Sequence, residues 1–129
     1  MNAVSRRSSP AAAPQTARVL PFPTFPKPVP RMILWDEPGS PQEEAVRGRL
    51  VDAGYQAVKW TSEPAMGYPP HVHIYPELLW LISGSLTVIL PAEGRLLELA
   101  PGDRVELPQG LAHGTLAGAE GATYLLATK

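Results

Sequence analysis

The 129-residue sequence predicts one all-β domain, with a short helix before the strands and a proline-rich N-terminal tail. From residue 57 onward, short apolar stretches alternate with Gly and Pro turns, which is typical of an antiparallel barrel or sandwich. Only residues 41–53 combine a helical apolar period with helix end signals. Residues 1–31 hold seven of the sixteen prolines. We therefore expect a tail over residues 1–31 and a single domain over residues 32–129.

Dense proline removes backbone donors from residues 1–31 and favours extended segments, so we expect this tail to be disordered. Two other interpretations stay open. The Ser and Arg content without acidic residues suits a targeting peptide, and the proline repeats suit a ligand for an aromatic groove. Translation could start at Met1 or at Met32, where the globular pattern begins.

The domain begins with a short strand over residues 31–36 (RMILWD), followed by a helix at about 41–53. Ser40 is the expected N-cap, with Pro41 at the first helical position and Glu43 completing a capping box. The expected apolar stripe and the glycine that ends the helix are Ala45 or Val46, Leu50, Ala53 and Gly54. The charged residues between them indicate a solvated face without chemistry.

The barrel is expected at about 57–128. Its strands are expected at residues 57–61, 78–83, 86–90, 95–100, 104–107, 113–116 and 122–128. Gly84-Ser85 reads as a tight turn that joins two strands into a hairpin. Residues 78–82 are apolar on both faces, so their outer face needs cover from the first strand, the helix or a second subunit. Trp35 and Trp80 are candidates for that cover or interface.

All three histidines of the chain belong to one candidate site. In a helix, His71 and His73 would point to nearly opposite sides, whereas in a strand they share a face roughly 7 Å apart. The two prolines before His71 disfavour a helix, so we place the pair on a strand. Glu77 has the same parity and joins them if the strand continues, although Pro76 suggests a bulge or an edge position.

The third histidine, His113, follows a later strand pattern. Three imidazoles and one carboxylate are ligand types that a divalent transition metal takes from a protein. A single histidine is more often an ordinary core or surface residue. The spacing of the pair, the parity of Glu77 and the absence of any other histidine favour a metal site.

These residues resemble the two motifs of the cupin superfamily. The first motif is His-x-His, three residues, Glu, six residues and Gly, which matches His71, His73, Glu77 and Gly84. The second is Gly, five residues, Pro-x-Gly, two residues and His, which matches Gly102, Pro108, Gly110 and His113. The resemblance covers about residues 57–128. Two positions depart from it: the glycine before the first motif is Gly67, two positions late, and Ala117 stands where an Asn often closes the second.

The resemblance implies a jelly-roll β-barrel with a metal inside one open end, and commonly a homodimer. His71, His73, Glu77 and His113 would then be the ligands. This ligand set suits Mn, Fe, Ni, Co, Cu or Zn and is not selective among these metals. Glu77 is either a permanent ligand or a base, and Tyr75 is the other candidate for a chemical role. Lys59, Arg104 and Tyr124 could approach the pocket, but each is expected more simply as a surface or rim residue.

Composition excludes several other classes of function. The chain has no Cys, which removes disulfides and thiolate chemistry and fits a reducing cytoplasm. The net charge of −1 gives no reason to expect nucleic acid or an anionic membrane as a partner. No apolar run reaches the roughly 18 residues that a membrane helix needs.

The leading hypothesis is a metal-dependent cupin enzyme that acts on a small organic substrate by dioxygenase-like oxygenation or by isomerisation. One rival is a non-catalytic small-molecule-binding or sensor module, in which the metal anchors a ligand or stabilises the barrel. The other is a structural role for the histidines without metal. Bulky inward residues such as Leu79, Leu81 and Leu107 would close the pocket and argue against an enzyme.

Overall fold

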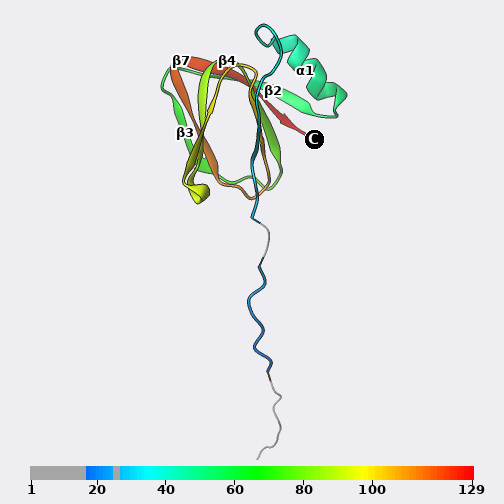
Figure 1. Cartoon of the computed structure of the whole chain (residues 1–129), viewed down its shortest axis with the longest axis vertical. Helices are drawn as coiled ribbons and strands as arrows, with labels where there is room; N and C mark the ends of the chain where they lie inside the picture. The colour runs from blue at the N-terminus through cyan, green and yellow to red at the C-terminus, as the bar shows by residue number, and fades with distance from the viewer. Residues whose placement is uncertain (1–16, 25–26) are drawn as a thin grey trace, which may run out of the picture.

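The computed structural model describes residues 17–24 and 27–129 and confirms an antiparallel β-barrel with one short helix (Figure 1). The elements, in chain order, are β1 (Arg31–Ile33), α1 (Glu43–Asp52), β2 (Gln56–Ser62), β3 (Gly67–His71), β4 (Glu77–Leu90), a 3₁₀ turn (Pro91–Glu93), β5 (Arg95–Leu99), β6 (Arg104–Leu107) and β7 (His113–Thr128). Among the described residues, no helix is long and apolar enough to cross a membrane.

Two long strands, β4 and β7, hold the barrel together because each pairs with different partners along its length. The first part of β4 pairs with β6 and with the end of β7, and its last part pairs with β5 and with the start of β7. The start of β7 also pairs with β3, and its end pairs with β2. Pairing with the start of β7 therefore attaches β3 to the barrel beside the candidate site.

The prediction of a hairpin at Gly84-Ser85 is wrong, because β4 continues through these residues as one strand. Gly84 has φ 81°, and a Cβ added there would meet the carbonyl oxygen of Gly121 at 2.1 Å. Gly121, with φ 76°, lies on β7 where the β4–β7 register shifts. The two glycines therefore bend the paired strands at a corner of the barrel. A glycine with positive φ suits such a bend as well as it suits a turn. For the same reason, the strands expected at 113–116 and 122–128 are one strand, β7.

Helix α1 covers the outer face of β4. Val46 and Leu50 are buried in one cluster with Leu78, Trp80 and Ile82. The same chain therefore supplies the cover that these residues need, and Trp80, 3% exposed, is not available as a subunit interface. Trp35 is partly buried against the same cluster.

The ends of α1 differ in part from the sequence prediction. Its N-cap is Gln42 without a side-chain cap, so Ser40 does not cap the helix and Glu43 forms no capping box. Gly54, with φ 90°, follows the helix as expected of a glycine stop. Of the expected stripe, only Val46 and Leu50 are buried.

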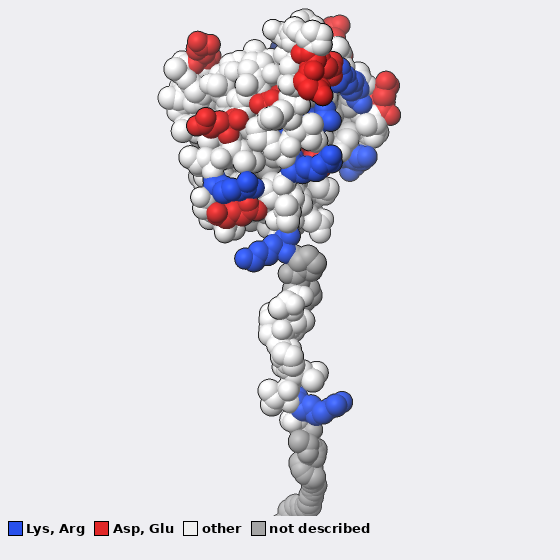
Figure 2. Space-filling model, viewed as in Figure 1, with Lys and Arg blue, Asp and Glu red and all other residues white. Residues whose placement is uncertain are grey.

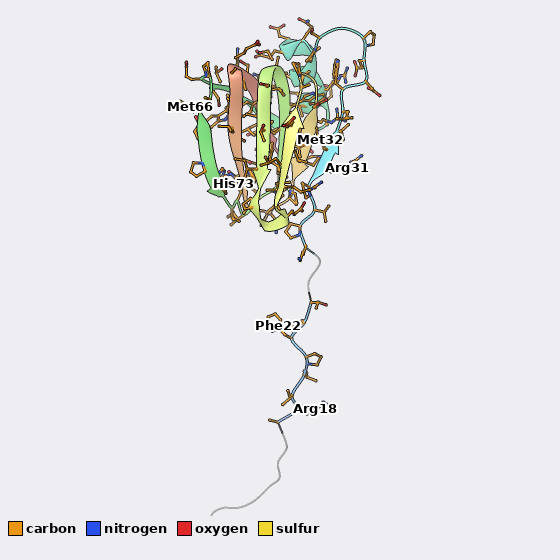
Figure 3. All side chains as sticks on the ribbon, turned by 60° about the vertical axis from the view of Figure 1, so that its left-hand side comes forward. Arg18, Phe22, Arg31, Met32, Met66 and His73 are labelled. Carbon is orange, nitrogen blue, oxygen red and sulfur yellow. The ribbon has the colours of Figure 1, made fainter. Side chains whose placement is uncertain are left out.

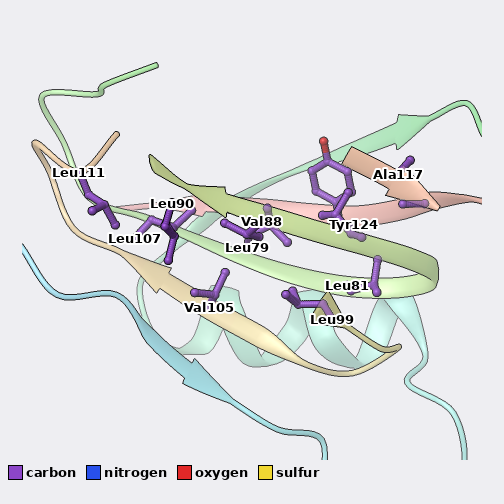
Figure 4. Packing of buried hydrophobic residues seen from close by; sticks show 12 residues of the cluster. Leu79, Leu81, Val88, Leu90, Leu99, Val105, Leu107, Leu111, Ala117 and Tyr124 are labelled. Atoms are coloured by element: carbon purple, nitrogen blue, oxygen red, sulfur yellow. The ribbon is translucent and has the colours of Figure 1, made fainter. Parts of the chain in front are cut away.

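A second apolar cluster fills the interior of the barrel and extends from Leu107 and Leu111 to Leu81 and Ala117 (Figure 4). Leu79, Leu81, Val88 and Leu107 are fully buried in it. Tyr124 belongs to the cluster through its ring, while its hydroxyl points away from the labelled apolar side chains (Figure 4). The hydroxyl lies near the side chains of Ser62 and Thr115, which offset part of the rise in its pKa that burial causes.

The N-terminal tail is described only in part, since residues 1–16 and 25–26 lie outside the described residues; the prediction of disorder there is not addressed by the structure. Residues 17–24 have no regular secondary structure, and their side chains are exposed. Figure 3 shows Arg18 and Phe22 on a segment that extends away from the barrel. Acidic and basic side chains are intermixed over the face of the barrel seen in Figure 2.

Candidate metal centre

The four candidate ligands lie on β3, on the loop after it, on β4 and on β7, and they meet at one end of the barrel. His71 is the last residue of β3, His113 is the first of β7, and the two are direct partners in the β3–β7 register. His73 lies beyond the end of β3, and Figure 3 shows it at the end of the barrel opposite Met66. Glu77 opens β4.

The expectation of one strand that carries His71, His73 and Glu77 is therefore wrong in detail. A loop over residues 72–76 separates β3, which ends at His71, from β4, which begins at Glu77. The loop is held by the second motif: the backbone N–H of Gly110 donates to the carbonyl of His73 at 2.9 Å. This contact keeps His73 beside the strands that carry the other donors.

The three imidazoles form a compact group in which one potential ligand atom of each lies within 4.8 Å of the others. The ring centroids of His71 lie 4.5 Å from His73 and 4.8 Å from His113. Glu77 Oε1 lies 3.5 Å from His73 Nε2 and 3.4 Å from His113 Nε2. The group runs from buried His113 to exposed His71, so one side of it is open to the barrel mouth.

Backbone carbonyls orient two of the rings. His71 Nδ1 lies 3.1 Å from the carbonyl oxygen of Pro69, and His113 Nδ1 lies 3.1 Å from that of Leu111. A carbonyl can only accept, so each Nδ1 must carry the proton, and the Nε2 of a neutral ring then presents its lone pair. This is the arrangement by which proteins orient histidine ligands of metals.

The charges of His113 and Glu77 are coupled. Burial by itself raises the pKa of the Glu77 carboxyl, but the hydrogen bond from His113 and the nearby imidazoles outweigh it and hold the pKa below its ordinary value. Burial alone lowers the pKa of His113, but the contacts with Glu77 and the Leu111 carbonyl raise it overall. The point between these side chains therefore favours a positive charge, either a proton or a metal ion.

The donor set fits a divalent metal. With metal–ligand bonds of about 2.1 Å, adjacent ligand atoms lie about 3.0–3.4 Å apart. The two distances from Glu77 to the imidazoles, 3.4 and 3.5 Å, are close to this range. The imidazole nitrogens are somewhat more widely spaced, so small ring rotations are needed to bring all four donors to one ion.

A cavity of about 400 Å³ adjoins these donors. It is lined by Val58, Trp60, Tyr68, His71, His73, Tyr75, Glu77, Leu79, His113, Thr115, Tyr124, Leu126 and Thr128. Tyr75 and Tyr124 therefore line the cavity, and Leu81 and Leu107 do not close it. Lys59 and Arg104, expected as surface or rim residues, do not line it: Lys59 pairs with Glu43, and Arg104 lies over the Trp80 ring.

Several lining residues escaped the sequence analysis. Val58 and Trp60 share the parity of one strand face, which was a usable signal once β2 was assigned. Tyr68 lies three residues before His71, next to a pairing irregularity, and Thr115 follows His113 at strand parity. For Tyr68, no local pattern indicates the cavity.

No protein-family model matches the sequence, and no curated protein gives a significant match. Several solved structures are similar. The polyketide cyclase RemF from Streptomyces resistomycificus is 27% identical over 57% of this chain, with a TM-score of 0.54. The match spans only 53% of the RemF chain, about half its length.

Two further structures match over more of the chain. A cupin superfamily protein from Desulfitobacterium hafniense is 10% identical over 81% of each chain, with a TM-score of 0.50. A protein with a double-stranded β-helix domain from Klebsiella pneumoniae is 19% identical over 82% of this chain and 79% of its own, with a TM-score of 0.51. Together with the barrel topology, these similarities show that this chain has the cupin fold.

Proposed function

We propose that this protein is a metal-dependent enzyme that acts on a small organic molecule bound inside the barrel. His71, His73, Glu77 and His113 would hold a divalent transition metal. The observation that carries the proposal is the cavity of about 400 Å³ beside these four donors, because a purely structural metal needs no such space. The volume is within the range of roughly 300–1,000 Å³ that small-molecule pockets occupy.

When bound, the metal would supply Lewis acidity toward a substrate oxygen, or lower the pKa of bound water. The protein residues have separate tasks. The carbonyl oxygens of Pro69 and Leu111 orient the rings of His71 and His113. Glu77, which lies beside two imidazoles, is either a metal ligand or a general base. The Tyr124 phenol, whose pKa burial raises above its ordinary value, is neutral near pH 7 and can donate a hydrogen bond.

The reaction class we favour is oxygenation or isomerisation. The likeness to RemF, whose name is that of a polyketide cyclase, supports an enzyme. The fold alone does not, because one fold supports many unrelated activities.

A non-catalytic binding protein is the second candidate, and one observation favours it. Apart from the proposed ligands, the polar groups that line the cavity within the described part of the chain are the hydroxyls of Tyr and Thr and the indole N–H of Trp60. Such groups orient a ligand but transfer protons poorly near neutral pH. For either candidate function, we also propose that the protein forms a homodimer and is located in the cytoplasm.

Elemental analysis tests the metal site. Tag-free protein is expressed with Mn, Fe, Co, Ni, Cu and Zn in the medium and compared with His71→Ala and with Lys59→Ala as a surface control. We expect about one metal per chain in the wild type and in the control, and its loss in His71→Ala. No metal in the wild type would overturn the proposal.

Turnover then separates the two candidates. Metal-loaded protein is incubated, with and without dioxygen, with a library of phenols and ketones in excess, and the mixture is analysed by mass spectrometry. An enzyme converts many equivalents of one compound. A binding protein retains about one equivalent unchanged. Zinc as the sole metal would leave the choice to this second measurement, because zinc occupies such sites without redox chemistry.

A further inference from the structure

The cavity beside the metal centre has aromatic and apolar walls. Trp60 and Tyr68 lie in edge-to-face contact on one side, with ring centroids 6.0 Å apart. Tyr75 lies over His73, with centroids 5.0 Å apart and ring planes inclined by 34°. Aromatic rings around a pocket favour planar apolar ligands, which they contact by stacking or by their edges.

Several of these lining side chains are largely exposed to solvent. Trp60 is 40% exposed, Val58 60% and Tyr75 44%. Val58 and Trp60 lie on the face of β2 that lines the cavity, whereas Lys59 between them turns to the outside and pairs with Glu43 at 3.1 Å. A bound apolar molecule would remove this surface from water, which is favourable by the hydrophobic effect.

No Lys or Arg among the described residues lines the cavity. The cationic side chains of the barrel and helix are engaged elsewhere. Arg104 lies over the Trp80 ring at 4.4 Å, and Lys129 lies over Tyr55 at 4.6 Å. The remaining pairs are Arg31 with Glu106, Arg47 with Glu43, Arg49 with Glu37, and Arg95 with Glu93.

The charge of the site limits its ligand further. A divalent ion and the Glu77 carboxylate together carry one net positive charge, which compensates one ionised oxygen but not the two charges of a phosphate monoester. An uncompensated charge in an apolar pocket is strongly unfavourable. From the walls and the charge together, we infer that the cavity binds an aromatic molecule that carries a hydroxyl or carbonyl oxygen and no strongly anionic group.

This inference rests on the proposed function, because the metal would bind the oxygen of the ligand. It adds the chemical class of the substrate. The aromatic rings would contact Trp60 and Tyr75. The oxygen would lie toward the histidines, where Tyr124 can donate a hydrogen bond. Phosphorylated sugars and nucleotides are excluded as substrates.

Calorimetric titration of zinc-loaded protein tests the inference with 2-naphthol and 2-naphthyl phosphate, which share a ring system and differ in charge. Zinc is chosen because it does not turn the probe over by redox chemistry. We expect 2-naphthol to bind at least about tenfold more tightly than the phosphate ester, a difference of about 1.4 kcal/mol. Equal or tighter binding of the ester would overturn the inference.

Two variants locate the binding site. Trp60→Ala is expected to weaken 2-naphthol binding about fivefold or more, because it removes a large aromatic contact. Leu96→Ala, which truncates a 63% exposed side chain on β5 away from the cavity, is the control and should bind as the wild type does. Unchanged binding by Trp60→Ala would contradict the inference.

Val58→Lys tests whether the absence of a cation from the cavity wall disfavours anionic ligands. It places a cation on the cavity-facing side of β2 at a position 60% exposed, where the fold tolerates it. We expect the ratio of ester to naphthol affinity to rise about tenfold. An unchanged ratio would show that the missing cation does not decide selectivity and would overturn this part of the inference.

The zinc content of every sample separates this inference from the proposed function. If zinc binds at one equivalent but 2-naphthol gives no saturable heat, only the ligand class is wrong. If zinc does not bind, or if His71→Ala retains it, the metal centre itself is wrong.

Discussion

His71 and His113 face each other directly across β3 and β7, with their ring centroids 4.8 Å apart. The two residues are 42 positions apart in the sequence, so their meeting depends on the pairing of β3 with the start of β7. That pairing leaves His113 buried and His71 exposed. The candidate site therefore has one buried imidazole and one exposed imidazole.

Glu77→Gln should weaken metal binding at least about tenfold, because the amide keeps the size of the side chain but loses its negative charge. Glu98→Gln, on the exposed face of β5, is the matched control and should not change the affinity. Competition with a chromogenic chelator measures both variants. Equal affinity of Glu77→Gln and the wild type would remove Glu77 from the ligand set.

Metal affinity should fall as the pH is lowered. The pKa of His113 is raised because its contact with Glu77 stabilises the imidazolium, so below that pKa a proton occupies the nitrogen that the metal needs. Above it the ring is neutral and the affinity should level off with respect to this group. Chelator competition from pH 5 to pH 8 measures the profile. In Glu77→Gln the break should move to lower pH, and a break that does not move would contradict the coupling.

Gly114→Ala should weaken metal binding without removing a donor. A Cβ at this position would meet the carbonyl oxygen of Tyr68 at 2.7 Å and the backbone nitrogen of Pro70 at 2.9 Å. These are backbone atoms of β3, so β3 must shift away from β7 and carry His71 away from His113. We expect a loss of about tenfold in affinity, since ligand geometry is what sets it.

Gly48→Ala is the control for that experiment. Gly48 lies in the interior of α1, and a Cβ there meets nothing within 4 Å. It should raise the free energy of unfolding by up to about 1 kcal/mol, because alanine favours the helix, and leave metal affinity unchanged. Thermal unfolding and chelator competition on both variants check the contrast. Wild-type affinity in Gly114→Ala would show that β3 accommodates the methyl group without moving its ligand.

Leu50→Ala should lower the free energy of unfolding by about 2–5 kcal/mol, because it opens a cavity between α1 and the outer face of β4. Leu50 is 2% exposed, whereas its neighbour Val51 is 58% exposed. Val51→Ala is therefore the control, with an expected change within about 0.5 kcal/mol. Urea unfolding measures both. A small effect of Leu50→Ala would mean that α1 does not provide the cover for Trp80.

Local patterns predicted much of the fold. The positions of β2, β5 and β6 follow from apolar stretches bounded by Gly and Pro, and Gly54 marks the end of α1 as its positive φ requires. The error at Gly84 has a physical cause. A glycine with positive φ serves a turn and a strand bend equally well, and only the contact with Gly121 decides between them.

Similar reasons explain the other differences. The capping pattern at Ser40 is a local preference, and the helix begins at Glu43, two residues after the expected first helical position at Pro41. The apolar outer face of β4 required cover, but its sequence does not say whether a helix or a subunit supplies it. Tyr68 lines the cavity because β3 crosses beside β7, a pairing between distant segments that leaves no mark near Tyr68 itself.

The sequence by itself determined the all-β class, the one helix and the identity of the four candidate ligands, because strand period, glycine and proline positions and donor chemistry are local properties. Only the tertiary structure decided that His73 reaches the site from a loop, that α1 covers Trp80, and that aromatic side chains without a nearby cation line the cavity. These features depend on which strands pair and how side chains pack across them, and long-range pairing is settled by the burial of the whole barrel rather than by any one segment.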